Sequence, residues 1–395
     1  MKRRSFVVNS SLATAAMMST PLNQIKGIDP SDKVSVGVIG TGSRGTGLIK
    51  SLNDIPQFEV HACCDILPFR LEGALEYTAG ATPYKDYRAL LDRKDLDAIV
   101  IATPLYLHHE MAKATIQTNK HIYLEKTMTF HVDEALELVA MCNDYEKVFQ
   151  VGHQYRATPL YHQVAEIIRE GYLGQITNIT VQWNRNGDWR RPVHNPEYEK
   201  IINWRMYKAY SSGLTAELHS HQLDYINWIF DQHPQRVMGM GGIDYWKDGR
   251  ETYDNVNTLF EYPNGMKVNC ISLTSNAHQG YAIKFKGSKG TIVMDMHKAT
   301  LYLEPLNAKE KGMVDGVSGA TMPKEAEKGL EIPSRDEKGY SNTRYALEAF
   351  HNSIISGDIP ASNVTTGARA AIAVRLAVDA MREGVVKTWK KEFGV

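Results

Sequence analysis

A glycine-rich turn between an apolar strand and a helix constrains the fold of this chain most. Val34–Ile39 is rich in β-branched residues, Gly40-Thr41-Gly42-Ser43-Arg44-Gly45 follows with GxGxxG spacing, and 46–52 continues as a helix. The first glycine permits a tight turn, the second lets backbone N–H groups approach a pyrophosphate, and the third lets helix and strand pack closely. The helix N-terminus then faces the phosphate charges. The segment predicts a dinucleotide-binding βαβ unit.

An acidic residue after the next strand supports this interpretation. The strand-like segment Phe58–Asp65 ends in Asp65, twenty residues beyond Gly45. A carboxylate there can accept hydrogen bonds from a ribose diol, and it repels a 2′-phosphate, so NAD is favoured. Arg44 nearby keeps NADP as the less favoured cofactor. The alternative is a glycine-rich turn with an incidental surface aspartate, and the order strand, turn, helix, strand, acid argues against it.

Strands and helices then alternate up to residue 156. Strand-like segments at 96–104, 121–126 and 147–156 alternate with helical segments at 108–118 and 132–145. Such alternation predicts an open parallel sheet, whose ligands lie outside the carboxyl ends of the strands. The polar groups that follow these strands should therefore surround one crevice: Thr103-Pro104, Glu125-Lys126 and His153-Gln154-Tyr155-Arg156.

The pattern changes after Arg156. One helical segment is followed by alternating strand-like segments at 176–186, 236–246, 255–265, 266–275, 281–290 and 291–304. Residues 306–338 have the composition of a long loop, and 343–355 and 367–384 are helical. The predicted fold class is α/β: a Rossmann-type parallel-sheet domain (31–155), then an α+β domain with a large, mostly antiparallel open sheet (156–340). Helices in 341–395 should pack back on the body.

Charge and the first thirty residues bound the partners and the location. Lys plus Arg (45) equals Asp plus Glu (45), so the chain has no net positive charge that would favour binding to nucleic acid. Residues 1–30 combine a basic cluster with an Ala- and Ser-rich run and contain Arg3-Arg4, which resembles a twin-arginine export signal. We expect export to the periplasm; a basic tail on a cytoplasmic protein is the alternative. No later apolar run approaches the ~20 residues of a membrane span.

Beyond residue 33 the chain resembles the Gfo/Idh/MocA family of NAD(P)-dependent sugar oxidoreductases. The resemblance rests on GTGSRG (40–45), Asp65, IATPLYLHHEMA (101–112), EK (125–126), EGYLGQI (170–176), NWR (203–205) and ELHSHQLD (217–224). It implies that NAD is bound by Gly40, Gly42, Ser43, Arg44, Gly45, Asp65, Thr103, Pro104, His108, Glu125 and Lys126.

The resemblance also implies the acid–base residues. Family members carry Lys in an EKP motif; here Lys126 is followed by Thr127. A lysine beside the nicotinamide can polarise the reacting oxygen. Glu217, His221 and Asp224 match a second pattern, with Glu in place of the usual Asp. On an α-helix Glu217 and His221 share a face, so His221 is the expected general base and Glu217 is expected to orient it or to bind a neighbouring hydroxyl.

Two other interpretations compete at this helix. Glu217, His219, His221 and Asp224 could bind a metal, but His219, two positions from each neighbour, would point elsewhere on a helix, so no metal is expected. The same residues could also be a structural helix cap. Substrate contacts are expected from Tyr155, Arg156, Trp204, Arg205 and His219. The charged, Trp-rich segment 182–205 is typical of a lid.

The sequence therefore predicts an exported oxidoreductase that moves a hydride between NAD and a secondary hydroxyl of a sugar or glycoside, for example the hydroxyl at C3. Lys126 and His221 would serve as acid and base. One alternative is an NAD-dependent glycosidase or lyase that oxidises C3 transiently. An alternative of another class is a non-catalytic sugar-binding protein with structural NAD. A homo-oligomer, dimer or tetramer, is also expected.

Overall fold

The computed structural model describes residues 33–304, 313–314, 317–318 and 329–395. Residues 34–395 form one compact unit. The export signal predicted at 1–30 lies outside the described residues, and so does much of the loop predicted at 306–338. No helix in the described part of the chain is both long enough and apolar enough to cross a membrane.

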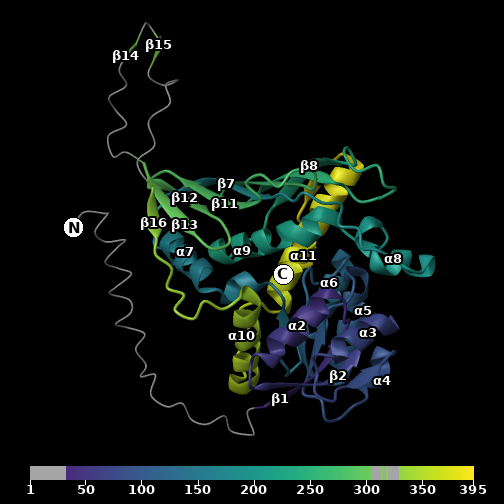
Figure 1. The fold of residues 1–395 in the computed structure, drawn as a ribbon. Coiled ribbons are helices and arrows are strands. Elements are labelled where there is room, and N and C mark those ends of the chain that lie inside the picture. The colour runs from purple at the N-terminus through teal and green to yellow at the C-terminus, as the bar shows by residue number, and fades with distance from the viewer. Residues whose placement is uncertain (1–32, 305–312, 315–316, 319–328) are drawn as a thin grey trace. The chain divides into compact units, whose positions relative to one another are not determined.

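The first sheet has six parallel strands in the order β3-β2-β1-β4-β5-β6 (Figure 1). Their bounds are β1 Val34–Ile39, β2 Phe58–Cys64, β3 Thr82–Tyr84, β4 Ala98–Ile101, β5 His121–Leu124 and β6 Phe149–Val151. The helices between them are α2 Ser43–Asn53, α3 Pro68–Leu75, α4 Tyr87–Leu91, α5 His108–Gln117 and α6 Val132–Met141. The strand order reverses between β1 and β4, and the carboxyl ends at such a point are where ligands bind.

The second sheet has nine strands in the order β16-β13-β12-β11-β7-β10-β9-β8-β17. Their bounds are β7 Ile176–Trp183, β8 Arg236–Gly242, β9 Asn255–Glu261, β10 Lys267–Leu273, β11 Tyr281–Gly287, β12 Gly290–Met294, β13 Ala299–Leu303, β16 Leu330–Ile332 and β17 Lys387–Thr388. Only β7 and β10 pair in parallel; the other pairs of this sheet are antiparallel. The two-sheet α/β fold expected from the sequence is confirmed.

Helices cover one face of this second sheet. Figure 1 shows α7 (Pro159–Arg169), α9 (Ser220–Phe230) and α11 (Val364–Glu383) on the same side of it. Burial alternates along the strands accordingly: in β9 Val256, Thr258 and Phe260 are buried, whereas Asn257 is exposed. In β8 the side chains of Met238 and Met240 are 51% and 83% exposed, so part of the opposite face is open and apolar.

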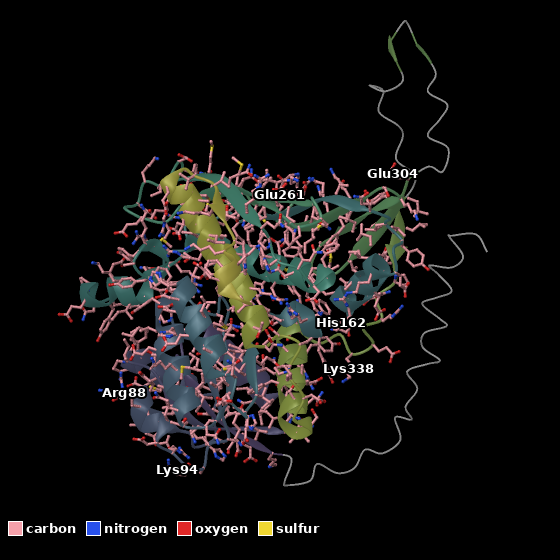
Figure 2. The ribbon with its side chains drawn as sticks, turned by 180° about the vertical axis from the view of Figure 1, so that it is seen from behind. Arg88, Lys94, His162, Glu261, Glu304 and Lys338 are labelled. Carbon is pink, nitrogen blue, oxygen red and sulfur yellow. The ribbon has the colours of Figure 1, made fainter. Side chains whose placement is uncertain are left out.

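The C-terminal helices tie the two sheets together. In α10 (Asn342–Ser356), Phe350 stacks on Phe58 with ring centroids 6.3 Å apart and meets Tyr123 edge-on at 5.7 Å, so a distant segment completes the core of the first domain. Helix α11 packs on α6, α9 and β8. Figure 2 shows this helix from behind, running from the second sheet, marked by Glu261, towards the first domain, marked by Arg88 and Lys94.

Three local features differ from expectation. Within the predicted loop 306–338, Leu330–Ile332 forms β16 and pairs with β13, and Met313–Val314 (β14) pairs with Val317–Ser318 (β15). The short strands β3 and β17 were not expected, because three or two residues are too few to show a hydrophobic period. Residues Thr215–His219 form a π-helix before α9, where a continuous α-helix was expected.

Candidate active site

The glycine turn after β1 has a shape that only glycine fits. Gly40 has φ +89°, and a Cβ atom at Gly45 would lie 1.8 Å from the Gly40 carbonyl oxygen. Helix α2 therefore starts directly against β1, with Ser43 as its first residue and Gly42 just before it. This close approach leaves the helix N-terminus facing the carboxyl edge of the sheet, which fits a dinucleotide pyrophosphate.

Asp65 lies beside this turn, where the sequence predicted it. Its Oδ2 accepts a hydrogen bond from Thr41 N at 2.8 Å, and its Oδ1 accepts one from Leu67 N at 2.9 Å. A carboxylate has about four acceptor positions, so capacity remains for a ribose hydroxyl. Asp65 therefore fits the adenosine ribose and also braces the glycine turn.

Arg70, on α3, is a residue that the sequence interpretation missed. A Cβ atom at Gly42 would lie 3.4 Å from Arg70 Nη1, so the guanidinium reaches the phosphate turn. Burial lowers the pKa of Arg70; Asp65 opposes that shift, and the like charges of Arg205 and Arg191 add to it. The positive charge of Arg70 beside the turn suits a dianionic pyrophosphate.

Arg44 and Glu125 bind each other. Arg44 Nε and Nη2 lie 2.8 and 2.7 Å from Glu125 Oε1, and Arg44 Nη1 donates to Thr343 Oγ1 at 3.0 Å. Both residues were predicted to contact the cofactor, and Arg44 was the reason for keeping NADP open. Their contacts join α2 to the end of β5 and to α10, and contact of either residue with the cofactor stays a prediction.

His108 links the segments that follow β4 and β5. Its Nδ1 lies 2.8 Å from the Thr127 carbonyl oxygen, and its Nε2 lies 3.0 Å from the Thr103 carbonyl oxygen. The side chain is 2% exposed. Thr103 Oγ1 is buried without a partner, and Pro104 precedes the 3-10 helix Leu105–Leu107. Thr103 also lies against the glycine turn, because a Cβ atom at Gly40 would lie 2.9 Å from Thr103 Cγ2.

Lys126 is anchored on the π-helix of the second domain. Its Nζ donates to the carbonyl oxygen of Glu217 at 3.0 Å and approaches that of Ala216 at 3.5 Å. Thr127 Oγ1, in the position where the family pattern has Pro, donates to the Ala216 oxygen at 3.0 Å. The Lys126–Thr127 peptide bond is cis. A lysine ammonium has three donors, so this arrangement fixes the amine and leaves it a further donor.

Glu217 pairs with Arg205 and not with His221. Arg205 Nε donates to Glu217 Oε2 at 2.7 Å, and the Arg205 guanidinium lies over the buried Trp204 ring at 4.3 Å. Burial alone would raise the pKa of Glu217, but Arg205 and Lys126 together hold it below its ordinary value. The expectation that Glu217 orients His221 is not met, since a π-helix widens the turn and separates positions that an α-helix would stack.

His221 lies in an aromatic, water-poor environment. Its ring centroid is 5.3 Å from that of Tyr155, 5.9 Å from Trp183 and 6.0 Å from His153. Burial first, and then the charges of Lys126, His153 and Arg44, hold its pKa well below the ordinary value. The imidazole is therefore neutral at neutral pH, which is the state a general base needs.

Arg156 was predicted to contact substrate, and the structure places it in a buried ion pair. Its Nε and Nη2 lie 2.8 and 2.9 Å from the two Asp224 carboxylate oxygens, and its Nη1 donates to the Ala361 carbonyl oxygen. Asp224 is 0% exposed, so its charge requires such a partner. The guanidinium is thus held by Asp224 and Ala361 inside the protein.

His219 and Tyr155 are also buried. His219 was expected to reach substrate, but it is 0% exposed and its ring faces the backbone of Ile271 in β10. Tyr155 is stacked on Tyr161 at 4.0 Å and tilted over His221, and burial raises its pKa to about 12. Tyr155 therefore lines the His221 environment as a neutral phenol, whereas His219 belongs to the packing between helix and sheet.

Two further observations bear on ligands. The described residues contain no group of three or more His, Cys, Asp or Glu that could hold a metal ion.

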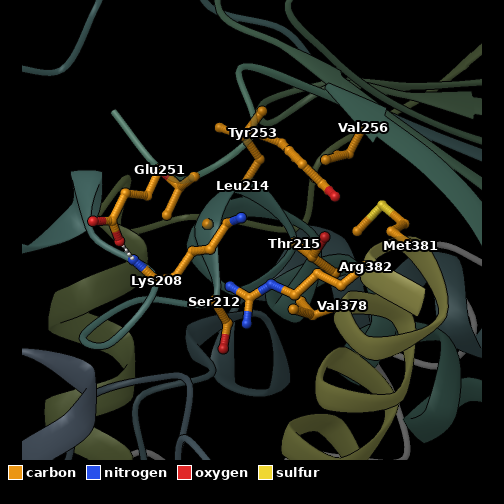
Figure 3. A pocket seen from close by; sticks show the side chains of 12 residues that line it. Lys208, Ser212, Leu214, Thr215, Glu251, Tyr253, Val256, Val378, Met381 and Arg382 are labelled. Atoms are coloured by element: carbon orange, nitrogen blue, oxygen red, sulfur yellow. Dashed lines mark hydrogen bonds between the residues drawn. The ribbon is translucent and has the colours of Figure 1, made fainter. Parts of the chain in front are cut away.

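The cavity of Figure 3 lies where the π-helix begins, with Lys208, Thr215 and Arg382 among its lining residues. Its volume of about 10 Å³ is room for roughly one water molecule, so it is too small for a sugar.

Comparison with known proteins decides the family. The family model GFO_IDH_MocA, described as "oxidoreductase family, NAD-binding Rossmann fold", matches residues 34–153. The model of the GFO/IDH/MocA C-terminal domain matches residues 161–293. The chain belongs to the Gfo/Idh/MocA oxidoreductase family. Residues 34–153 accordingly form its NAD-binding domain.

Several similar proteins have names that refer to sugars. Levoglucosan dehydrogenase of Pseudarthrobacter phenanthrenivorans is 26% identical over 299 residues, which cover 67% of this chain and 74% of that protein. A glycosyl hydrolase family 109 protein of Shewanella amazonensis is 29% identical over 213 residues, 47% of this chain and 44% of that protein. A solved levoglucosan dehydrogenase in complex with NADH and levoglucosan superposes with a TM-score of 0.72 at 20% identity, covering 90% and 99% of the two chains, which shows the shared fold.

Proposed function

We propose that this protein transfers a hydride between NAD and a secondary hydroxyl of a sugar or glycoside, with Lys126 and His221 as its acid–base pair. The observation that carries the proposal is their juxtaposition. Lys126, at the end of β5, is anchored on the backbone beside Glu217, and its charge acts on His221 four residues further along. The sugar-acting relatives of this family support the substrate class.

The two side chains have complementary roles in this proposal. The bound nicotinamide supplies the hydride acceptor or donor. The Lys126 ammonium donates a hydrogen bond to the reacting oxygen and stabilises the negative charge that develops there. The neutral His221 imidazole takes the hydroxyl proton during oxidation and returns it during reduction. Arg205, held by Glu217, and Trp204, over whose ring the Arg205 guanidinium lies, are proposed to contact the sugar ring.

A second outcome of the same chemistry is favoured by the similarity to a glycosyl hydrolase family 109 protein. Transient oxidation at C3 would acidify the C2 proton and allow elimination of the aglycone with formation of a C1–C2 double bond. Water would then add across this double bond, and reduction at C3 by the bound NADH would restore the hydroxyl and NAD. This outcome suits an exported protein, because a cofactor that regenerates itself needs no recycling outside the cytoplasm. We favour the simple dehydrogenase, since no residue identifies a dedicated acid for a glycosidic leaving group.

A glycoside panel in heavy water separates the two outcomes. A dehydrogenase should reduce bound NAD in a single turnover, leave the glycosidic bond intact, and continue only when a ketone acceptor is added. A self-recycling glycosidase should release aglycone without an oxidant and place deuterium at C2. A protein that binds sugars but shows neither NADH absorbance nor C2 exchange would be the non-catalytic binding protein.

The cellular location and the oligomeric state of the protein are also proposed from its sequence and surface. We propose export through the Arg3-Arg4 signal. Cell fractionation tests this proposal: the double variant Arg3→Lys and Arg4→Lys should be retained in the cytoplasm.

We also propose a homo-oligomer that uses the open face of the second sheet, where Met240 is 83% exposed. Met240→Asp should then lower the mass measured by light scattering; an unchanged mass would place the contact elsewhere.

A further inference from the structure

His153 has a buried, unpaired imidazole next to the proposed base. It follows β6 at the carboxyl edge of the first sheet, and its side chain is 2% exposed. Neither ring nitrogen has a hydrogen-bond partner, and Nδ1 of His221 is also buried without one. Buried polar atoms in folded proteins are nearly always paired, so each unpaired one calls for an explanation, of which a catalytic role is one.

The surroundings of His153 offer a partner on each side. Its Nδ1 lies 3.6 Å from Asp224 Oδ1, and its ring meets the ring of His221 nearly perpendicularly, with centroids 6.0 Å apart. Asp224 is fixed by the two-pronged ion pair with Arg156, so its position is determined by the fold. Catalytic hydrogen bonds are often long in an unliganded protein and shorten when the ligand binds.

We propose that His153 is a positioning residue that links Asp224 to His221 and sets the tautomer of the base. His153 Nδ1–H donates to the Asp224 carboxylate, and His153 Nε2 accepts from Nδ1–H of His221. Two hydrogen bonds thereby satisfy all three unpaired nitrogens. They leave His221 Nε2 with its lone pair free, and this atom takes the substrate hydroxyl proton. The proposal rests on the proposed function only for that last step.

The charges around His153 are consistent with a neutral ring. Asp224 and Arg156 face it from one side, Lys126 and Glu125 from the strand ends of the first domain, and His221 from α9. Burial, the largest effect, lowers the pKa of His153, and the attraction of Asp224 is opposed by Arg156. A neutral imidazole carries one N–H and one lone pair, as the chain of hydrogen bonds requires.

His219 provides a matched control. It is a buried histidine two residues before His221, and both of its ring nitrogens also lack hydrogen bonds, but it faces β10 and not Asp224. His153→Leu and His219→Leu remove the same group from two equally buried sites. His153→Gln keeps one donor and one acceptor in the side chain, so it should retain part of the positioning effect.

The first measurement is ¹⁵N NMR of histidine-labelled full-length protein saturated with NAD, with resonances assigned from His153→Leu, His219→Leu and His221→Ala. We expect His221 to be the Nδ1–H tautomer in the wild type and in His219→Leu, and to become a mixture or the Nε2–H tautomer in His153→Leu. An unchanged His221 tautomer in His153→Leu would overturn the proposal. This result does not depend on any substrate being turned over.

The second measurement is single-turnover NADH formation with a sugar that the wild type oxidises. His153→Leu should slow it by about 10–100-fold, the range expected for losing one hydrogen bond to a group that becomes charged in the reaction, with NAD affinity unchanged. His153→Gln should recover at least part of that loss, and His219→Leu should stay near the wild-type rate. Equal slowing in both Leu variants would indicate general destabilisation and overturn the positioning role. If no sugar is oxidised by the wild type, the proposed function fails while the NMR result still decides the role of His153.

Discussion

Burial sets the protonation state of the proposed base, His221. The ring is 9% exposed and surrounded by Tyr155, Trp183 and His153, and its pKa is held well below the ordinary value. The nearby Lys126 ammonium acts in the same direction. Both effects keep the imidazole neutral, so the lone pair that a base needs is present over a wide pH range.

His221→Ala should slow hydride transfer by about 10²–10⁴-fold, the contribution of a positioned general base. NAD affinity should hardly change, because His221 lies on α9 in the second domain. Stopped-flow absorbance of NADH and a separate NAD titration check the two parts. A variant that loses NAD binding and transfer together would assign His221 to the cofactor site.

The dependence of the single-turnover rate on pH below 7.5 tests whether His221 is neutral. A base with an ordinary histidine pKa near 6.5 would lose about fourfold in rate between pH 7.5 and 6. Since the pKa of His221 is lowered, its neutral fraction stays close to one over that interval, and the single-turnover rate should be nearly flat. A fourfold fall that disappears in His221→Ala would show that the ring is more hydrated than the structure indicates.

Asp65 should determine the choice of cofactor. Asp65→Ala removes the ribose partner and the support of Thr41 N and Leu67 N, so both nucleotides should bind more weakly, and NAD should lose more than NADP. The ratio of the two dissociation constants from thermal-shift or fluorescence titrations is the measurement. Asp65→Asn, which keeps the shape without the charge, is the companion variant. An unchanged ratio in both would remove Asp65 from ribose recognition.

The turn between β1 and α2 makes the clearest prediction at the scale of an element. Gly45→Ala places a Cβ atom 1.8 Å from the Gly40 carbonyl oxygen, so α2 must move away from β1 and the phosphate site must open. Gly47→Ala, two residues along the same helix, meets nothing within 4 Å. NAD binding should be strongly weakened in the first variant and retained in the second. Equal affinities, measured by titration, would show that the turn does not hold the pyrophosphate.

Elements with a strong hydrophobic period were predictable from the sequence, and those governed by distant contacts were not. The buried runs of β1 and β4 and the alternation in β9 identified both sheets. The π-helix at Thr215–His219 has no such signature. Its consequences were missed with it: Glu217 pairs with Arg205, and the freed carbonyl oxygens receive Lys126.

The same limit applies within the candidate site. Lys126, His221 and Asp65 follow strands or match spaced motifs, so their positions could be inferred. Arg156 and His219 could not be separated from substrate contacts, because the partners that bury them, Asp224 and β10, lie far away in the sequence or on another element. Arg70 lacked a motif, and its approach to Gly42 depends on the orientation of α3.

The whole molecule holds several histidines buried in the neutral state, and this should make it sensitive to acid. Burial lowers the pKa values of His153, His219 and His221, and that of His219 to about 4. An unfolded chain binds protons at these rings near pH 6.5, so below that pH the unfolded state takes up more protons than the folded state. Their contribution to stability is therefore complete above pH 6.5 and is lost as the pH falls towards the folded-state values.

His219 alone should contribute about 2 kcal/mol to the loss of stability between pH 7.5 and pH 5, and about 3 kcal/mol by pH 4. Urea unfolding of the wild type and of His219→Leu at these pH values measures it: the variant should lose less stability on acidification by that amount. His297→Asn, a change at an exposed turn, serves as the control and should follow the wild type. Because the comparison is a difference between variants, acid effects from carboxylates cancel. Parallel curves for wild type and His219→Leu would mean that His219 is protonated equally in both states, and that water reaches the space between the π-helix and β10.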